Sequence, residues 1–112
     1  MSGHVVILTT AGTEQEASDL ARELVNRRLA ACVNVIPQVR SIFRWQNEVH
    51  DDREWLLLIK TRRDRYEAVR AAIRELHSYD LPETVLLDID RGDEAYLRWI
   101  DDSLDGSGPE AT

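Results

Sequence analysis

The chain has 112 residues, of which 43% are hydrophobic and 31% are charged, and its formal net charge is −7. This composition predicts one folded domain with its own core and excludes an intrinsically disordered chain. The negative charge argues against nonspecific nucleic-acid binding, because nothing offsets repulsion by the phosphates. The single cysteine, Cys32, excludes an internal disulfide framework and fits a reducing compartment. With no signal-peptide core and no apolar run of membrane-spanning length, we expect a cytoplasmic protein.

The first elements are a strand and a helix. Residues 4–10, HVVILTT, form a short β-branched apolar run that is typical of a buried strand. Thr13 and Glu16 then have the spacing of a capping box, which predicts a helix start at Thr13. Apolar residues recur on one helical face after it, and we expect this helix to end near Leu29.

A long hairpin is predicted next. Residues 31–46 have the β-branched and aromatic composition of a strand, and the alternation of apolar positions changes parity within it. Pro37 lacks a backbone donor, so it indicates an edge position or a bulge there. Residues 46–48, QNE, favour a tight turn, since asparagine tolerates the left-handed conformation. Residues 49–60 are the return strand.

The second half of the chain repeats the alternation of helix and strand. Thr61 and Asp64 have capping-box spacing before a helical face that ends at Leu76. Residues 84–89 form a further strand, and Gly92-Asp93 begins a last helix. The segment 105–112 is predicted to be a flexible tail after a domain core at about 4–103. This order predicts an α+β fold, the ferredoxin-like split βαβ arrangement (βαββαβ) of an antiparallel sheet, with an additional C-terminal helix.

The long hairpin also predicts self-association. A strand over 31–46 spans about 50 Å at roughly 3.3 Å per residue, whereas a compact domain of this size has a radius of gyration of about 13 Å. The far end should overhang the core and expose Ile42, Phe43, Trp45 and Val49. An exposed apolar edge of this kind invites pairing with another chain. The alternative is a strand that bends at Pro37 and folds back over its own core.

Candidate metal ligands gather around the segment HSYDLPE, residues 77–83. His77 could supply an imidazole to Cu²⁺ or Zn²⁺, Asp80 and Glu83 could add carboxylate oxygens, and Cys32 could add a thiolate. The alternatives are a histidine that caps the preceding helix and a cysteine that packs as a small apolar side chain. The spacing is not one of the strong metal motifs. No nucleophile elbow or phosphate-binding glycine loop is present, so we do not expect an enzyme.

Four blocks in this order resemble the CutA family of divalent-cation tolerance proteins: AACVNVIPQVRSIFRWQNEV, LLLIKTR, HSYDLPE and YLRWI. The similarity runs from about residue 4 to 103. It implies a homotrimer with a ferredoxin-like fold, related in architecture to the PII signalling proteins, and a role in binding and tolerating divalent metal ions such as Cu²⁺. The metal ion is expected not to be required for folding. The chain departs from the family pattern HPYEVPE at Ser78, Asp80 and Leu81, and it has Asn47 where a glycine is usual in the turn.

The relation to PII proteins suggests a second kind of site. By this fold-level analogy, Trp45, Lys60 and Tyr79 would lie near a cleft between subunits, with Lys60 as an anion contact. The alternatives are interface packing for the two aromatic residues and a strand-end lysine that reaches water. The sequence thus leaves three functions open: a metal-binding tolerance trimer, a PII-like sensor of a small ligand with an unidentified protein partner, and a structural or anchoring trimer without a ligand.

Overall fold

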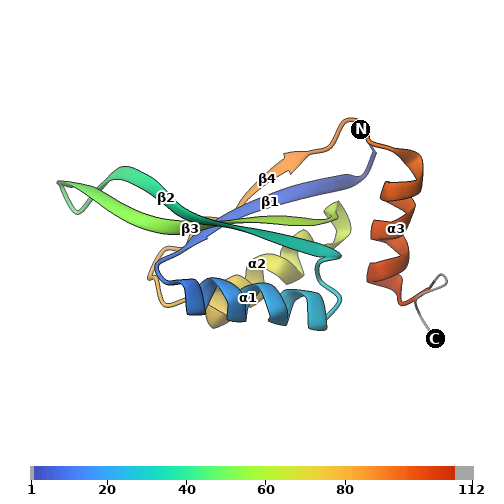
Figure 1. Cartoon of the computed structure of the whole chain (residues 1–112), viewed down its shortest axis with the longest axis horizontal. Helices are drawn as coiled ribbons and strands as arrows, with labels where there is room; N and C mark the ends of the chain where they lie inside the picture. The colour runs from blue at the N-terminus through green and yellow to red at the C-terminus, as the bar shows by residue number, and fades with distance from the viewer. Residues whose placement is uncertain (1, 108–112) are drawn as a thin grey trace.

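The computed structural model describes residues 2–107 and contains one four-stranded sheet. Its strands are β1 (His4–Ala11), β2 (Cys32–Trp45), β3 (Glu48–Arg62) and β4 (Val85–Asp88), in the spatial order β2-β3-β1-β4 with every neighbouring pair antiparallel (Figure 1). This is the predicted ferredoxin-like α+β arrangement, which is therefore confirmed. No helix within the described residues is long and apolar enough to cross a lipid bilayer.

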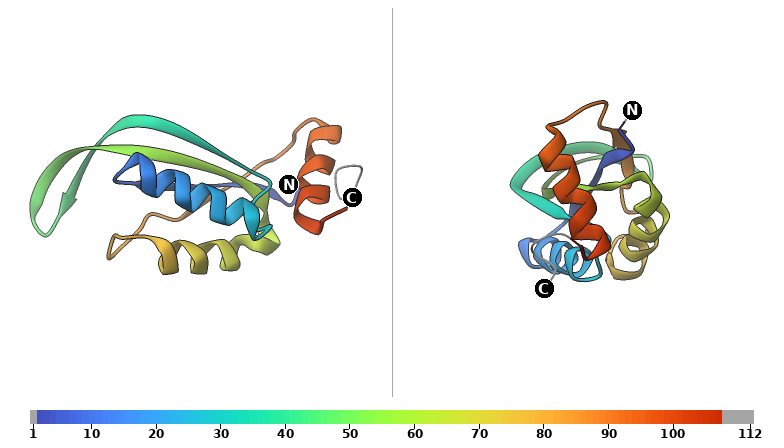
Figure 2. Two further views of the ribbon diagram at one scale, coloured as in Figure 1. Left: turned by 60° about the horizontal axis from the view of Figure 1, so that its bottom comes forward. Right: turned by 90° about the vertical axis from the view of Figure 1, so that its right-hand side faces the viewer.

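Two helices cover one face of the sheet. They are α1 (Glu14–Asn26) and α2 (Tyr66–Leu76), which lie side by side beneath it (Figure 2). Odd-numbered apolar residues of the central strands point toward these helices because side chains alternate along a strand. The fully buried side chains at this interface include Val5, Ile7, Leu24, Leu57, Ile59, Val69 and Ile73.

The predicted additional helix is α3 (Glu94–Asp105), which lies at the end of the sheet opposite the hairpin tip (Figure 1). Asp93 begins it as predicted, and its carboxylate accepts a hydrogen bond from the backbone N–H of Tyr96 at 3.1 Å. Polar contacts hold α3 to the sheet: Arg62 donates to Asp101 at 3.3 Å and to Asp105 at 2.8 Å. The flexible tail was predicted to begin at residue 105, but Asp105 is still part of α3. Residues 108–112 of the predicted tail lie outside the described part of the chain.

Two predicted helix boundaries need correction. The N-cap at Thr13 is confirmed, because its hydroxyl accepts from the N–H of Glu16 at 3.1 Å. The helix ends at Asn26 rather than near Leu29, since Arg28 turns the chain with a left-handed φ of 57°. The predicted cap at Thr61 is wrong. Thr61 belongs to β3, and its buried hydroxyl instead donates to the carbonyl of Leu29 at 2.7 Å.

The hairpin has the predicted turn and the predicted bulge. Gln46 and Asn47 both have positive φ values, 51° and 66°, which is the two-residue turn whose twist suits antiparallel strands. The β2–β3 register shifts between Ile36 and Val39, where Gln38 takes a φ of 56°. Two residues, Pro37 and Gln38, therefore stand where the partner strand supplies only one.

Residues 39–54 form an arm that projects beyond the core. The last β1–β3 pair is Ala11 with Trp55, so beyond it β2 and β3 pair only with each other. The arm extends away from the helices and curves toward its tip (Figures 1 and 2). The molecule accordingly measures 49 × 27 × 23 Å. Ile42 and Val49 are each 65% exposed on this arm. The overhang is as predicted, and the association that it suggests stays a prediction.

Candidate functional site

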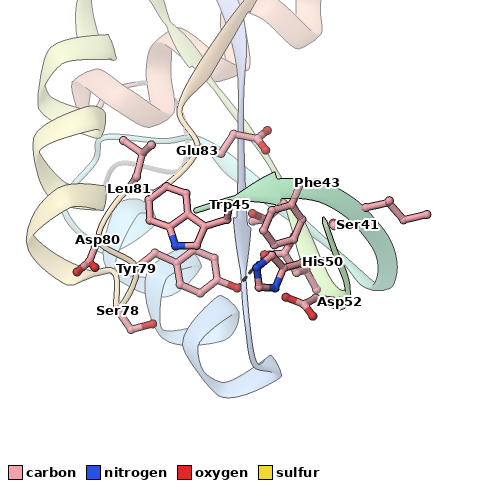
Figure 3. Close-up of a pocket in the computed structure, with 13 residues that line it drawn as sticks. Ser41, Phe43, Trp45, His50, Asp52, Ser78, Tyr79, Asp80, Leu81 and Glu83 are labelled. Carbon is pink, nitrogen blue, oxygen red and sulfur yellow. Dashed lines mark hydrogen bonds between the residues drawn. The ribbon is translucent and has the colours of Figure 1, made fainter. Parts of the chain in front are cut away.

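A pocket of about 740 Å³ opens where the arm leaves the sheet and meets the loop after α2 (Figure 3). The arm supplies one wall, the loop at residues 78–83 supplies the opposite wall, and the end of β1 contributes Thr10. The lining residues are Thr10, Ser41, Ile42, Phe43, Trp45, His50, Asp52, Glu54, Ser78, Tyr79, Asp80, Leu81 and Glu83.

The bulge in β2 decides which arm residues face this pocket. Before the bulge, Val33 and Val35 pair with core residues of β3. One extra residue reverses the parity, because successive side chains of a strand point to opposite faces. Beyond the bulge, Phe43 is therefore opposite His50, with ring centroids 5.3 Å apart, and Ser41 is opposite Asp52. Aromatic and acidic side chains of the arm thus share one face.

His77 fixes the loop that forms the other wall. Its side chain is fully buried, its Nε2 lies 2.5 Å from the carbonyl oxygen of Thr10, and its Nδ1 lies 3.0 Å from the backbone nitrogen of Tyr79. Since a backbone N–H can only donate and a carbonyl can only accept, the proton is on Nε2. Both ring nitrogens are thus occupied. His77 does end α2, but through its backbone N–H, which donates to Ile73.

Tyr79 connects the loop to the arm. Its hydroxyl donates to Glu54 Oε2 at 2.7 Å across the pocket (Figure 3), and Glu54 is only 6% exposed. Burial, and next this hydrogen bond to a carboxylate, raise the pKa of Tyr79 well above its usual value of 10. Partial desolvation, and next the negative charge of Glu54, raise the pKa of Glu83. The negative charge of Glu54 therefore acts on Glu83 across the pocket.

The pocket is acidic throughout. Four carboxylates line it, those of Asp52, Glu54, Asp80 and Glu83, and no lysine or arginine does. None of the four makes a salt bridge with another residue in the described part of the chain. Because a carboxylate in a partly desolvated site is costly unless it is paired, this pocket favours a cation and disfavours an anion.

The four predicted metal ligands do not come together in one chain. Asp80 and Glu83 line the pocket, and His77 lies behind it with both ring nitrogens occupied. Cys32 is paired with Lys60 at the other end of the sheet. Among residues 2–107, no three histidine, cysteine or acidic side chains are grouped closely enough to hold a metal ion. Metal ligation by these residues stays a prediction.

The three residues predicted near a cleft between subunits also do not all lie together in one chain. Trp45 and Tyr79 both line the pocket (Figure 3). Lys60 does not, because its Nζ lies 5.7 Å from the ring centre of Tyr96 on α3. The residue that the sequence analysis missed is Glu54. Its signal is an acid directly before the apolar run WLLLI, at a position whose side chain lies on the face of the strand opposite the core.

Comparisons with known proteins agree on one family. The family described as "CutA1 divalent ion tolerance protein" matches residues 5–103. The divalent-cation tolerance protein CutA of Thermus thermophilus is 44% identical over 95 residues, which make up 85% of this chain and 92% of that protein. A CutA homolog of Xenopus laevis is also 44% identical, over 83% of this chain and 62% of that protein, so this chain spans less than two thirds of that relative.

Solved structures show the same relationship. The divalent cation tolerance protein (Cut A1) of Thermus thermophilus has a TM-score of 0.85 at 43% identity, covering 87% of this chain and 94% of that one. The periplasmic divalent cation tolerance protein CutA of Archaeoglobus fulgidus has a TM-score of 0.88 at 35% identity, covering 90% and 98%. The chain therefore belongs to the CutA1 family of divalent ion tolerance proteins.

Proposed function

We propose that this protein is a homotrimer that binds divalent cations, Cu²⁺ among them, and thereby contributes to metal tolerance and to the response to metal ions. The observation that carries this proposal is the pocket lined by four carboxylates and no basic side chain. It agrees with the printed names of the relatives, which describe tolerance of divalent cations. The proposed role is binding rather than catalysis, and the proposed compartment is the cytoplasm.

The pocket supplies donors of the right chemistry but not a complete ligand set. Carboxylate oxygens of Asp52, Glu54 and Glu83 and an imidazole nitrogen of His50 are ligands that divalent ions accept. In one chain these groups are not grouped at metal-binding spacing. Water or a second chain must therefore complete the coordination of an ion bound there.

The arm supports the trimer part of the proposal. Its apolar side chains are exposed, and β2 is the edge strand of the sheet with unpaired backbone groups along its outer side. Pairing with a neighbouring chain would cover both features. Such pairing would also bring side chains of a second subunit toward the acidic pocket at the base of the arm.

The acidic lining of the pocket also makes the two alternative functions, a PII-like sensor and a structural trimer, weaker proposals. A PII-like site for a nucleotide or another anion would need basic side chains, and none lines this pocket. A purely structural trimer would give no role to the negative charge of Glu54, which is 6% exposed and shares the pocket wall with three more carboxylates.

Isothermal titration of Cu²⁺ and Zn²⁺ into the metal-free protein tests the proposal, with the oligomeric mass measured on the same sample. We expect a trimer and a saturable site that Glu54→Gln weakens, since this change removes the buried charge and keeps the side-chain shape. Glu94→Gln is the matched control, because it removes one charge from a side chain that is 90% exposed on α3. Nonsaturable binding, or equal binding by both variants, would contradict the proposal.

A further inference from the structure

We propose that Tyr79 is the positioning residue of the cation site: its hydroxyl fixes the carboxylate of Glu54 and leaves that carboxylate one oxygen for an ion, which favours Zn²⁺ and Cu²⁺ over Ca²⁺. This inference rests on the proposed binding of divalent cations at the pocket and adds the residue that sets its specificity. The contacts that carry it lie within one chain, so it does not depend on which outer faces of the arm a neighbouring subunit covers.

The hydrogen bond between Tyr79 and Glu54 joins the two walls of the pocket. The phenol, on the loop after α2, donates to Glu54 Oε2 at the base of the arm over 2.7 Å (Figure 3). Glu54 is 6% exposed, so little water competes for this bond. A hydrogen bond to an ionised acceptor is roughly twice as strong as one between neutral groups. Within residues 2–107, no donor is bonded to the other carboxylate oxygen, Oε1.

The position of the phenol is set by its own neighbours. The backbone N–H of Tyr79 donates to Nδ1 of the buried His77 at 3.0 Å, and the centroids of the two rings are 4.6 Å apart. A Cβ at Gly12 would lie 2.9 Å from the Tyr79 hydroxyl oxygen. Gly12 does not have a positive φ, so the backbone does not require a glycine there. The absence of a side chain at Gly12 instead provides the space in which the hydroxyl reaches Glu54.

One free carboxylate oxygen suits some divalent ions better than others. Zn²⁺ is usually held by about four ligands, with carboxylate oxygens at about 2.0–2.2 Å. Ca²⁺ takes about 6–8 oxygens and often binds both oxygens of one carboxylate. The proton that Tyr79 donates to Oε2 would repel a cation approaching that oxygen, so Glu54 can serve an ion through Oε1 only. Ca²⁺ thereby loses an oxygen ligand, whereas a smaller ion gains a carboxylate that is already oriented.

Calorimetric titration of Zn²⁺ and of Ca²⁺ into the metal-free native protein, at constant ionic strength, tests the inference. Tyr79→Phe removes the hydroxyl and keeps the ring. It should raise the Kd for Zn²⁺ about 10-fold to 100-fold, the usual effect of losing a group that orients a metal ligand, and it should not raise the Kd for Ca²⁺. Gly12→Ala displaces the same hydroxyl and should act in the same direction. Tyr96→Phe is the matched control, since this tyrosine is 42% exposed on α3, and it should change neither Kd.

A second measurement detects the hydrogen bond without a metal ion. Burial, and next the bond to Glu54, raise the pKa of the Tyr79 phenol. Ultraviolet titration of the metal-free protein, with the curve of Tyr79→Phe subtracted, should therefore show a lower pKa of Tyr79 in Glu54→Gln than in the wild type. An unchanged pKa would mean that this bond does not hold Glu54 in solution, and it would overturn the inference whichever ions bind.

The inference and the proposed function can fail separately. Suppose that Glu54→Gln weakens Zn²⁺ binding, but Tyr79→Phe weakens the binding of Zn²⁺ and Ca²⁺ equally or of neither ion. Tyr79 would then have no part in specificity, and the inference would be overturned while the cation-binding proposal stands. If the wild type binds neither ion saturably, the cation-binding proposal is contradicted and this inference with it.

Discussion

Replacing His77 with alanine tests whether this histidine holds the pocket together or ligates a metal ion. The change removes the bond from Nε2 to the carbonyl of Thr10 and leaves the backbone N–H of Tyr79 without its acceptor. It also empties the space of a fully buried ring. A lost hydrogen bond costs about 1 kcal/mol, and an unpaired buried donor costs about 1–3 kcal/mol. With the cavity that remains, we expect the free energy of unfolding to fall by about 2–4 kcal/mol.

Urea denaturation at a fixed protomer concentration measures this loss, because the stability of an oligomer depends on concentration. His77→Asn should recover part of it, since its side-chain oxygen can accept from the N–H of Tyr79. Ser78→Ala is the control at the adjacent residue, an exposed side chain that should leave stability within about 0.5 kcal/mol. If His77→Ala were as stable as the wild type yet lost Cu²⁺ binding, His77 would be a ligand and the structural role derived from its hydrogen bonds would be refuted.

Three further predictions concern other parts of the molecule. Arg62→Ala should loosen α3, which amide hydrogen exchange would show as faster exchange in that helix. Arg62 lowers the pKa of Asp105 below its usual 3.8. The stabilisation of the folded chain by this ion pair is therefore present above pH 3.8 and should be lost as the pH falls further. Gly12→Ala would place a Cβ 2.9 Å from the hydroxyl of Tyr79. Displacement of that hydroxyl should lower the pKa of Tyr79 back toward 10, measured by ultraviolet titration. At Asn47, where φ is 66°, glycine should be tolerated, whereas valine should destabilise the hairpin by about 1–2 kcal/mol, measured by thermal unfolding.

Local patterns predicted most of the fold correctly. The turn at 46–47 and the bulge at Pro37 follow from the backbone preferences of single residues, and such preferences act over short distances. The helix cap predicted at Thr61 was wrong because a contact between distant parts of the chain decides the role of this residue. Its hydroxyl bonds to the carbonyl of Leu29, 32 residues away, and no local pattern encodes that competition.

The pocket was only half predictable. The loop with Tyr79 and Glu83 attracted notice because polar and aromatic residues cluster within it. Glu54 did not, because it is one of several charged residues in this stretch and gains its role only from the hydroxyl of Tyr79, which is 25 residues away in sequence. Lys60 lies beside Tyr96 of α3, away from the pocket of the same chain, and its place near a cleft between subunits stays a prediction.

The bulge at residues 37–38 makes the arm tolerant of a change in chain length. Deletion of Gln38 would leave Pro37 alone opposite Trp55 and would keep every pair from Val39–Glu54 to Trp45–Glu48. Phe43 would stay opposite His50, because pairing with β3 sets the face on which an arm side chain lies. Among relatives of this protein, the segment at 36–39 can therefore differ in length by one residue while the same arm side chains line the pocket.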